Sequence, residues 1–387
     1  DAMWTVPPKA GSHDYLAAVE ERGGVTFAEN MRQDPRYVAI DNDAQRHAGG
    51  EIPFSVPGVD RRFPSILFES LATSIQPHLQ VPSAAAFPHY YNAAIRTLGP
   101  LLALAANSPF CPADWYDEGT DGHALVDATH HELRIAAFEQ SMNQACEKVR
   151  VPDDLDAPTD VVEHVVADDT YAPFLEEWVG EAPTEHDGGP VHIDSCWEFD
   201  YKRGTFWRWV RGVPGGDAVD GACDEQSLRI EYRPLPTQPT VRDVVGLQAL
   251  TAGLLHGLVA ADHPLAELPW DAAEASFYAA VEDGPDAELA WVDADGERTS
   301  DAETIFDEVF AYARRGLEAR GVSPATRDRY LAPLEARWEA GVTPSVWKKD
   351  RVRAHLDDGL DLEAALAAMQ REYVDLSRER DTFADWL

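Results

Sequence analysis

The amino-acid sequence predicts an α+β protein in which strands precede a mainly helical C-terminal part. Stretches in which polar and apolar residues alternate, or which are rich in aromatic and β-branched residues, predict strands at Ser74–Val81, Pro190–Val210 and Ser227–Tyr232. From Thr240 onward, apolar residues recur at helical spacing behind Ser, Thr or Asp residues of the kind that cap helices. We find no internal repeat and no low-complexity tract.

The N-terminal third begins with strand and loop and continues into helix. The first 70 residues mix Pro, Gly and polar residues with short apolar pieces such as Val25–Phe27 and Ile66–Phe68, which indicate strands and loops. After the strand at Ser74–Val81, helical spacing of apolar residues predicts a helix at Pro88–Ala106. This helix ends before the turn at Asn107–Pro109.

The middle of the chain predicts one helix, one insertion and one hairpin. The helix covers Leu125–Lys148, and residues 152–189 form an acidic insertion or loop that contains Pro and Gly. The two later strands are joined by Gly212–Glu225, which contains a Pro-Gly-Gly sequence and several acidic residues. Together these segments suggest a hairpin. The helices expected in the C-terminal part cover Thr240–Ala260, Asp301–Arg320, Ser323–Ala340 and Leu362–Leu376.

The charge of the chain is strongly negative and is spread along its length. The 387 residues include 69 acidic and 32 basic side chains, for a formal net charge of −37, and lysine is almost absent. Molar salt shortens the Debye length to about 3 Å and would screen the self-repulsion of such a surface. We therefore predict a salt-adapted protein whose stability depends on salt. Nucleic-acid binding is disfavoured, because it needs clustered Lys and Arg.

Cysteine usage and hydropathy predict a cytoplasmic protein. The four cysteines, Cys111, Cys146, Cys196 and Cys223, form no Cys-x-x-Cys pair, which is typical of a reducing compartment and indicates no structural zinc, although a disulfide stays open. No apolar run approaches the roughly 20 residues that span a bilayer. Asp1–Pro8 has no signal-peptide pattern, and we expect no membrane partner.

Two predicted strands carry polar side chains on one face. Gln76, His78 and Gln80 alternate along the first strand, so they share a face that is either solvent-exposed, which the pattern favours, or lines a polar cleft. Further along, Arg229, Glu231 and Arg233 alternate with apolar residues. A surface ion ladder is the simpler interpretation of this triplet. The alternative is that Glu231 holds a divalent metal while Arg233 binds a phosphate.

Other candidates are less specific. In Trp207–Arg211, the arginines either bind an anion or stack on tryptophan. Arg134 is either an ion-paired surface residue, which its pattern favours, or a clamp for a substrate carboxylate. The pairs His130-His131 and His192-x-Asp194 have no third metal ligand at a characteristic spacing. P-loop, Rossmann, α/β-hydrolase and zincin motifs are absent.

Several of these segments, in this order, resemble blocks of the type 2 glutamate-cysteine ligases. The segments are ATSIQPHLQV at 72–81, LGPLLALAANSPF at 98–110, ELRI at 132–135, FWRWVR at 206–211, LRIEYRP at 228–234 with Pro239-Thr240, and DAEL at 286–289. The likeness covers about Val25–Leu376. It implies one catalytic domain over residues 1–387 with a helical part at 301–387. The implied fold is glutamine-synthetase-like, a curved antiparallel sheet with helices on one face.

The resemblance also implies an activity and its partners. Members use ATP and Mg²⁺ to join the γ-carboxylate of glutamate to an amine, most simply cysteine, through an acyl phosphate, as in glutathione biosynthesis. The implied partners are these small molecules, and a homo-oligomer is compatible with the sequence.

The resemblance implies roles for six of the residues already named and for Asn107. Glu231 and His78 match metal-site positions, and Gln80 on the same strand is taken as a third metal ligand. Arg233 matches a phosphate-contacting arginine. The remaining candidates, for substrate or nucleotide binding, are Arg211, Arg134 and Asn107.

The chain departs from the family pattern at three places. No Glu-x-Glu strand precedes Val25, so we expect the leading part of the metal site to be missing from this sequence. Leu235-Pro236 stands where many members have Asp, and Gly284-Pro285-Asp286-Ala287 replaces a Gly-Leu-Asp-Ala block. Two alternatives therefore stay open: a ligase for another amine, and a ligase-like protein that binds without turnover.

Overall fold

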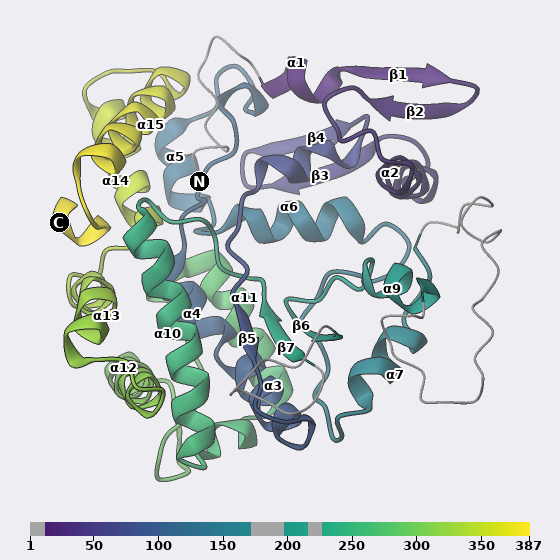
Figure 1. Ribbon diagram of the computed structural model, residues 1–387. Helices are drawn as coiled ribbons and strands as arrows, with labels where there is room; N and C mark the ends of the chain where they lie inside the picture. Colours follow the sequence, from purple (N-terminus) through teal and green to yellow (C-terminus); the bar gives the residue numbers. More distant parts are fainter. Residues whose placement is uncertain (1–11, 172–196, 216–226) are drawn as a thin grey trace, which may run out of the picture.

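The computed structural model describes residues 12–171, 197–215 and 227–387. It is 56% helical, and the strands of the described ranges form small antiparallel sheets, which confirms the α+β class (Figure 1). These sheets have two or three strands each. The curved sheet and the glutamine-synthetase-like fold that the resemblance implies therefore stay predictions.

The N-terminal region contains more helix than the sequence predicted. Its elements are α1 Ser12–Ala17, β1 Val19–Arg22, β2 Val25–Ala28, α2 Pro35–Ala48, β3 Ile52–Val56, β4 Val59–Phe63 and the 3₁₀ helix η3 Ile66–Leu71. The strand at Val25–Phe27 is confirmed. The strand expected at Ile66–Phe68 is wrong, because the hydroxyl of Ser65 accepts a hydrogen bond from the backbone N–H of Leu67 and starts a 3₁₀ helix.

A three-stranded sheet lies near the centre of the molecule. It consists of β5 His78–Gln80, β7 Leu228–Tyr232 and β6 Val210–Pro214, in the order β5-β7-β6 with antiparallel neighbours. The predicted antiparallel pairing is confirmed, but its first strand, β6, starts at the last residue of the predicted strand and runs into the predicted loop at Gly212–Glu225. Residues 216–226 lie outside the described residues. Half of the described part of the strand predicted at Pro190–Val210 is instead the helix α9 Trp197–Arg203, and only its last residue, Val210, belongs to the sheet.

Both long helices predicted before residue 150 are split into two. The elements of this region are η4 Ala84–Ala86, α3 Phe87–Arg96, α4 Leu98–Ala105, η5 Ala113–Trp115, α5 Gly122–Ala128, α6 Leu133–Met142 and α7 Asp160–Ala167. Pro100 cannot donate the backbone hydrogen bond that a continuous helix needs at that point, which explains the break at Thr97. Helix α7 lies inside the predicted insertion, whose remainder from residue 172 lies outside the described residues.

The C-terminal part is helical, as predicted. Its elements are α10 Val241–Ala260, η7 Pro264–Glu267, α11 Trp270–Asp283, η8 Gly284–Asp286, β8 Trp291–Val292, β9 Arg298–Thr299, α12 Ala302–Ala319, α13 Pro324–Glu339, α14 Pro344–Asp357, α15 Leu362–Glu379 and η9 Phe383–Trp386. The side chains of Thr240, Asp301, Ser323 and Asp361 each cap a helix. Helices α11 and α14 had no specific prediction.

Helix α10 is a core helix that packs closely on α12. A Cβ atom on Gly257 would lie 1.9 Å from the carbonyl oxygen of Tyr312, so only glycine permits this approach. The helix has 20 residues, and an 18-residue window of it has a mean hydropathy of 1.4, so by length and composition it could cross a membrane. The expectation of no apolar run near 20 residues was therefore wrong. Over half of its most apolar window is buried inside the fold, as core helices are.

The central sheet has one covered face and one polar face. On the covered face, Gly212 lies against Phe87 of α3, and the hydroxyl of Tyr91 donates a 2.9 Å hydrogen bond to the carbonyl of Val210. Leu79 and Ile230 are buried on the same side. Helix α9 lies near β6 in Figure 1, and His78, Arg211 and Arg229 of the sheet line one pocket together with residues of α9.

Candidate functional site

The polar face of the central sheet brings together residues from three separate parts of the sequence. In the register of the sheet, His78 and Arg211 both lie directly opposite Glu231, and Gln80 lies opposite Arg229. Directly opposed residues of an antiparallel pair point to the same face. The predicted alternation is thus confirmed for His78 with Gln80 and for Arg229 with Glu231, whereas Gln76 and Arg233 lie outside β5 and β7. The polar-cleft interpretation holds for His78.

The carboxylate of Glu231 is held between two arginines. It accepts a hydrogen bond from Nε of Arg211 and another, of 2.9 Å, from Nη1 of Arg233. Its side chain is only 3% exposed. Burial by itself would raise the pKa of Glu231, but the guanidinium groups of Arg211 and Arg233 more than offset it and lower this pKa. Glu231 is therefore an anion near neutral pH.

His78 lies at the edge of this ion cluster. Its Nε2 is 3.8 Å from Oε1 of Glu231, and its side chain is 44% exposed. Burial lowers the pKa of His78, and the nearby arginines lower it further against the opposing effect of Glu231. The imidazole is therefore neutral near pH 7, which is the state that binds metals or accepts protons.

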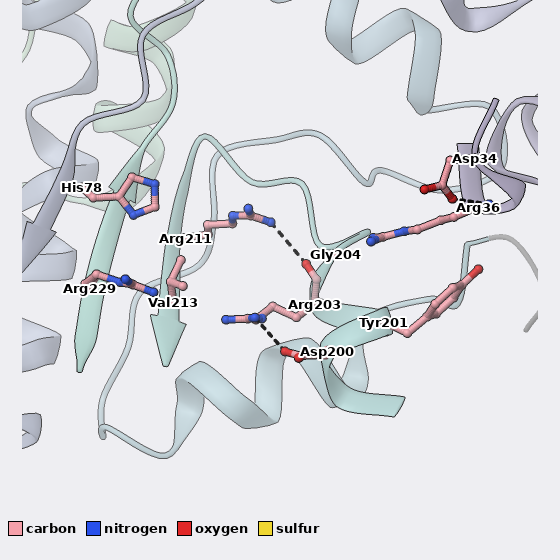
Figure 2. A pocket seen from close by; sticks show the side chains of 10 residues that line it. All are labelled: Asp34, Arg36, His78, Asp200, Tyr201, Arg203, Gly204, Arg211, Val213 and Arg229. Carbon is pink, nitrogen blue, oxygen red and sulfur yellow. Dashed lines mark hydrogen bonds and ion pairs between the residues drawn. The ribbon is translucent and has the colours of Figure 1, made fainter. Parts of the chain in front are cut away.

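A cavity of about 610 Å³ opens in front of this face, and we call it the arginine pocket. Figure 2 shows His78 and Arg229 on one side and residues of α9 and the start of α2 on the other. Its lining residues are Asp34, Arg36, His78, Asp200, Tyr201, Arg203, Gly204, Arg211, Val213 and Arg229. Four arginines against two aspartates make the pocket a site for an anion.

Two of these arginines have unused hydrogen-bonding capacity. The Nε atoms of Arg36 and Arg229 are buried and have no hydrogen-bond partner within the described residues. By contrast, Arg203 donates a 2.7 Å hydrogen bond to Asp200, and Nη1 of Arg211 donates one of 3.3 Å to the carbonyl of Arg203. Buried donors without partners are uncommon, and a polyanionic ligand such as a nucleotide phosphate chain would satisfy them.

Five of the seven predicted site residues do not line the arginine pocket: Glu231 and Arg233 adjoin it through Arg211, and the other three have separate partners. Arg134 is buried at the start of α6, where it donates to Glu132 over 3.2 Å and to the carbonyl of Pro234. Asn107 is fully buried, and its side-chain amide donates to the carbonyl of Thr237 over 2.7 Å. These contacts hold the segment that follows β7, and the substrate and nucleotide roles of both residues stay predictions.

Gln80 is the third of these residues. Although it shares the polar face, its amide nitrogen donates to the backbone carbonyls of Val81 and Leu228, over 3.0 and 3.2 Å. Its amide oxygen accepts a 2.6 Å hydrogen bond from the hydroxyl of Ser227. The side chain is therefore engaged in fixing the ends of β5 and β7, and its metal role stays a prediction.

The other sequence candidates have ordinary partners where they are described. Arg208 pairs with Asp168 at 2.8 Å and lies over the ring of Phe206 rather than a tryptophan. His131 is buried, with Nδ1 2.8 Å from the hydroxyl of Ser345. The pair His192 and Asp194 lies outside the described residues.

Sequence reasoning missed the far wall of the pocket. Asp34 and Arg36 come from the start of α2, a helix that was not predicted. Asp followed by Pro is a recognised signal for the start of a helix. Here Oδ1 of Asp34 accepts a 3.0 Å hydrogen bond from the backbone N–H of Arg36. Asp200 and Arg203 belong to α9, where aromatic residues favoured a strand. Only the tertiary fold brings these segments opposite the sheet.

The side chains of the described residues could hold a metal ion only if phosphate oxygens completed its coordination. Within the described part of the chain, no three His, Cys, Asp or Glu side chains are grouped as metal ligands. Mg²⁺ commonly binds through one or two carboxylates plus substrate phosphates and water. Glu231, with His78 beside it, fits that arrangement if a nucleotide in the arginine pocket brings the remaining oxygens.

These features define a class of protein: an α+β protein whose polar sheet face carries a buried carboxylate between arginines, beside a pocket lined by four arginines. Residues 26–378 match the family described as glutamate-cysteine ligase family 2, and the chain belongs to this family. The resemblance found in the sequence is thereby confirmed over nearly the whole chain. Membership implies an ATP-dependent carboxylate-amine ligase. No curated protein matches the chain.

Proposed function

We propose that this protein joins the γ-carboxylate of glutamate to the amine of cysteine, using ATP and Mg²⁺, to make γ-glutamylcysteine. Family membership supports the reaction class. The observation that carries the proposal is the Arg211–Glu231–Arg233 cluster at the arginine pocket. We place the reaction in the cytoplasm, on the grounds of cysteine usage.

The chemistry explains why such a pocket is needed. A carboxylate is a poor electrophile, and ATP would supply the phosphoryl group that turns the γ-carboxylate into an acyl phosphate, which the amine then attacks. In this scheme Arg211 and Arg229 hold phosphate oxygens by charge-assisted hydrogen bonds and neutralise their charge. Such positioned cations stabilise charge that develops during transfer.

Glu231 would have two roles in this scheme. Its ion pairs fix the guanidinium groups of Arg211 and Arg233 in place before a ligand arrives, which lowers the cost of organising the site. With His78 it would also offer a carboxylate and a neutral imidazole to the metal that accompanies the nucleotide. Arg233, whose side chain is 9% exposed, is shielded from water and would act at short range.

The experiment that tests the proposal is ADP release by the purified protein in molar salt. The reaction contains ATP, magnesium and glutamate, with and without cysteine, and is followed by identification of the product. Cysteine-dependent release with γ-glutamylcysteine as product is the expected result. Release that depends on another amine would make the protein a ligase for that amine. No release from a folded protein that binds ATP would favour a ligase-like binding protein instead.

A further inference from the structure

A second, smaller cavity adjoins the ion cluster at Arg233. It has a volume of about 330 Å³, and we call it the aromatic cavity. It lies between the N-terminal region, the 3₁₀ helix η3 and helix α6, and its walls include Met31, Phe138, Met142 and Trp207. The volume is at the lower end of the range for small-molecule pockets, so it suits a ligand of amino-acid size.

Three charged side chains line this cavity: Arg32, which is 77% exposed, and Glu69 and Arg233, which have opposite charges and unused hydrogen-bonding capacity. Arg233 donates to Glu231 through Nη1, but its Nε is buried and has no hydrogen-bond partner within the described residues. Glu69, from η3, also lines the cavity. Among the described residues, no group forms a hydrogen bond or a salt bridge with the Glu69 carboxylate. Burial raises the pKa of this carboxyl group, and the positive charges of Arg233 and Arg134 oppose that rise.

A free α-amino acid carries the complementary pair of charges. Its carboxylate can accept from the guanidinium of Arg233, and its ammonium can donate to Glu69. The thioether and aromatic walls would then surround the side chain, and such surfaces bind small apolar or sulfur-containing groups well. A dicarboxylic amino acid would suit this wall less well, because its second charge would be desolvated there.

The position of the cavity fits the order of the proposed reaction. Arg233 belongs to the cavity and to the ion cluster, whose other arginine, Arg211, lines the arginine pocket. An amine in the aromatic cavity would therefore lie beside the place where the activated carboxylate is expected. Of the two protons that the attacking ammonium must lose, one leaves with the phosphate as the C–N bond forms and the C–O bond to phosphate breaks. The other, which must leave first to free the nitrogen lone pair, passes to a base. Glu69 is a carboxylate placed to receive it.

We infer that the aromatic cavity binds the amine substrate, an α-amino acid with a small thiol or apolar side chain, through Glu69 and Arg233. This inference rests on the proposed ligase function. It assigns the second substrate to a site separate from the arginine pocket, and it gives Glu69 a role that no sequence pattern suggested.

The test is a calorimetric titration of the full chain with L-cysteine, in molar salt with a non-hydrolysable ATP analogue, magnesium and glutamate present. Glu69→Gln keeps the shape of the side chain and removes its charge. We expect it to weaken L-cysteine binding by roughly 10-fold or more, the value of one charge-assisted hydrogen bond. Binding of 3-mercaptopropionate, which has no ammonium, should not change. Glu29→Gln, an exposed carboxylate of the same region, is the matched control.

The outcomes separate this inference from the proposed function. Equal L-cysteine affinity of Glu69→Gln and the wild type, or no binding of L-cysteine, L-serine or L-alanine by the wild type, would overturn the inference. In turnover, Glu69→Gln should raise the KM for cysteine and leave the KM for ATP unchanged. Binding that needs Glu69 without ADP release would defeat the ligase and keep the amino-acid site.

Discussion

Nη1 of Arg233 donates a 2.9 Å hydrogen bond to Oε1 of Glu231, and Arg233 directly follows Tyr232, the last residue of the strand that carries Glu231. The backbone N–H of Arg233 donates a 2.9 Å hydrogen bond to the carbonyl of Trp209, which ties the residue after β7 to the residue before β6. Arg211 reaches the second carboxylate oxygen from the neighbouring strand. A charge cluster of this kind links the stability of the sheet to the function proposed for it.

Glu231→Gln is expected to abolish ligase activity and to destabilise the fold. Removal of the carboxylate charge leaves Arg211 and Arg233 close together without their shared anion, and breaking a buried ion pair costs on the order of 3 kcal/mol. Denaturant unfolding and ADP release measure the two effects. Glu282→Gln, on the exposed part of α11, is the control. A fully active variant would show that Glu231 holds neither arginine nor metal for catalysis.

The same pair predicts an effect of acid on stability. The pKa of Glu231 is lower in the folded protein than in the unfolded chain. Its contribution is therefore present above the unfolded pKa of about 4.3 and is lost as pH falls through the lower folded value. Unfolding free energies of the wild type should fall below about pH 4 more steeply than those of Glu231→Gln. Parallel curves would contradict the assignment.

Glu139 predicts the opposite dependence. This carboxyl accepts 2.8 Å hydrogen bonds from Trp209 and Tyr278, and burial raises its pKa to about 7 despite them. Its favourable contribution is present below the unfolded pKa and is lost as pH rises through about 7. Glu139→Gln should therefore gain stability relative to the wild type between about pH 4.5 and 7, by on the order of 2 kcal/mol. Denaturant titrations at several pH values provide the measurement.

Arg229→Gln is expected to separate nucleotide binding from stability. Arg229 lines the arginine pocket with a buried Nε that has no partner in the described part of the chain, so its removal breaks no ion pair there. We expect the KM for ATP to rise about 10-fold, the value of one charge-assisted contact, with little change in the unfolding midpoint. Arg353→Gln, exposed on α14 and paired with Asp127, is the control. An unchanged KM for ATP would exclude Arg229 from the nucleotide site.

The net charge of −37 predicts that stability depends on salt. In dilute buffer the acidic surface repels itself, and molar salt screens this repulsion to within about 3 Å. The thermal midpoint should therefore rise by many degrees between 0.1 and 2 M potassium chloride. A midpoint that is independent of salt would refute the prediction of salt adaptation.

Much of the fold could be predicted where local signals are strong. Helix α10 begins at Thr240 because its side chain caps the first turn, and Ser323 and Asp361 start α13 and α15 in the same way. The hairpin of β6 and β7 was also recognisable from its side chains. Helix α9 was missed, since its aromatic residues favour strand by propensity and tertiary packing overrides that preference.

The sequence by itself determined the reaction class, the acidic surface and the alternation that puts Arg229 and Glu231 on one face. Those properties depend on composition, short motifs and the two-residue period of a strand, all of which are local. The tertiary structure decided which partners meet that face: Arg211 across the sheet, Arg36 and Arg203 across the pocket, and Glu69 across the aromatic cavity. These contacts join residues far apart in the chain, and only the packing of the whole fold brings them within reach.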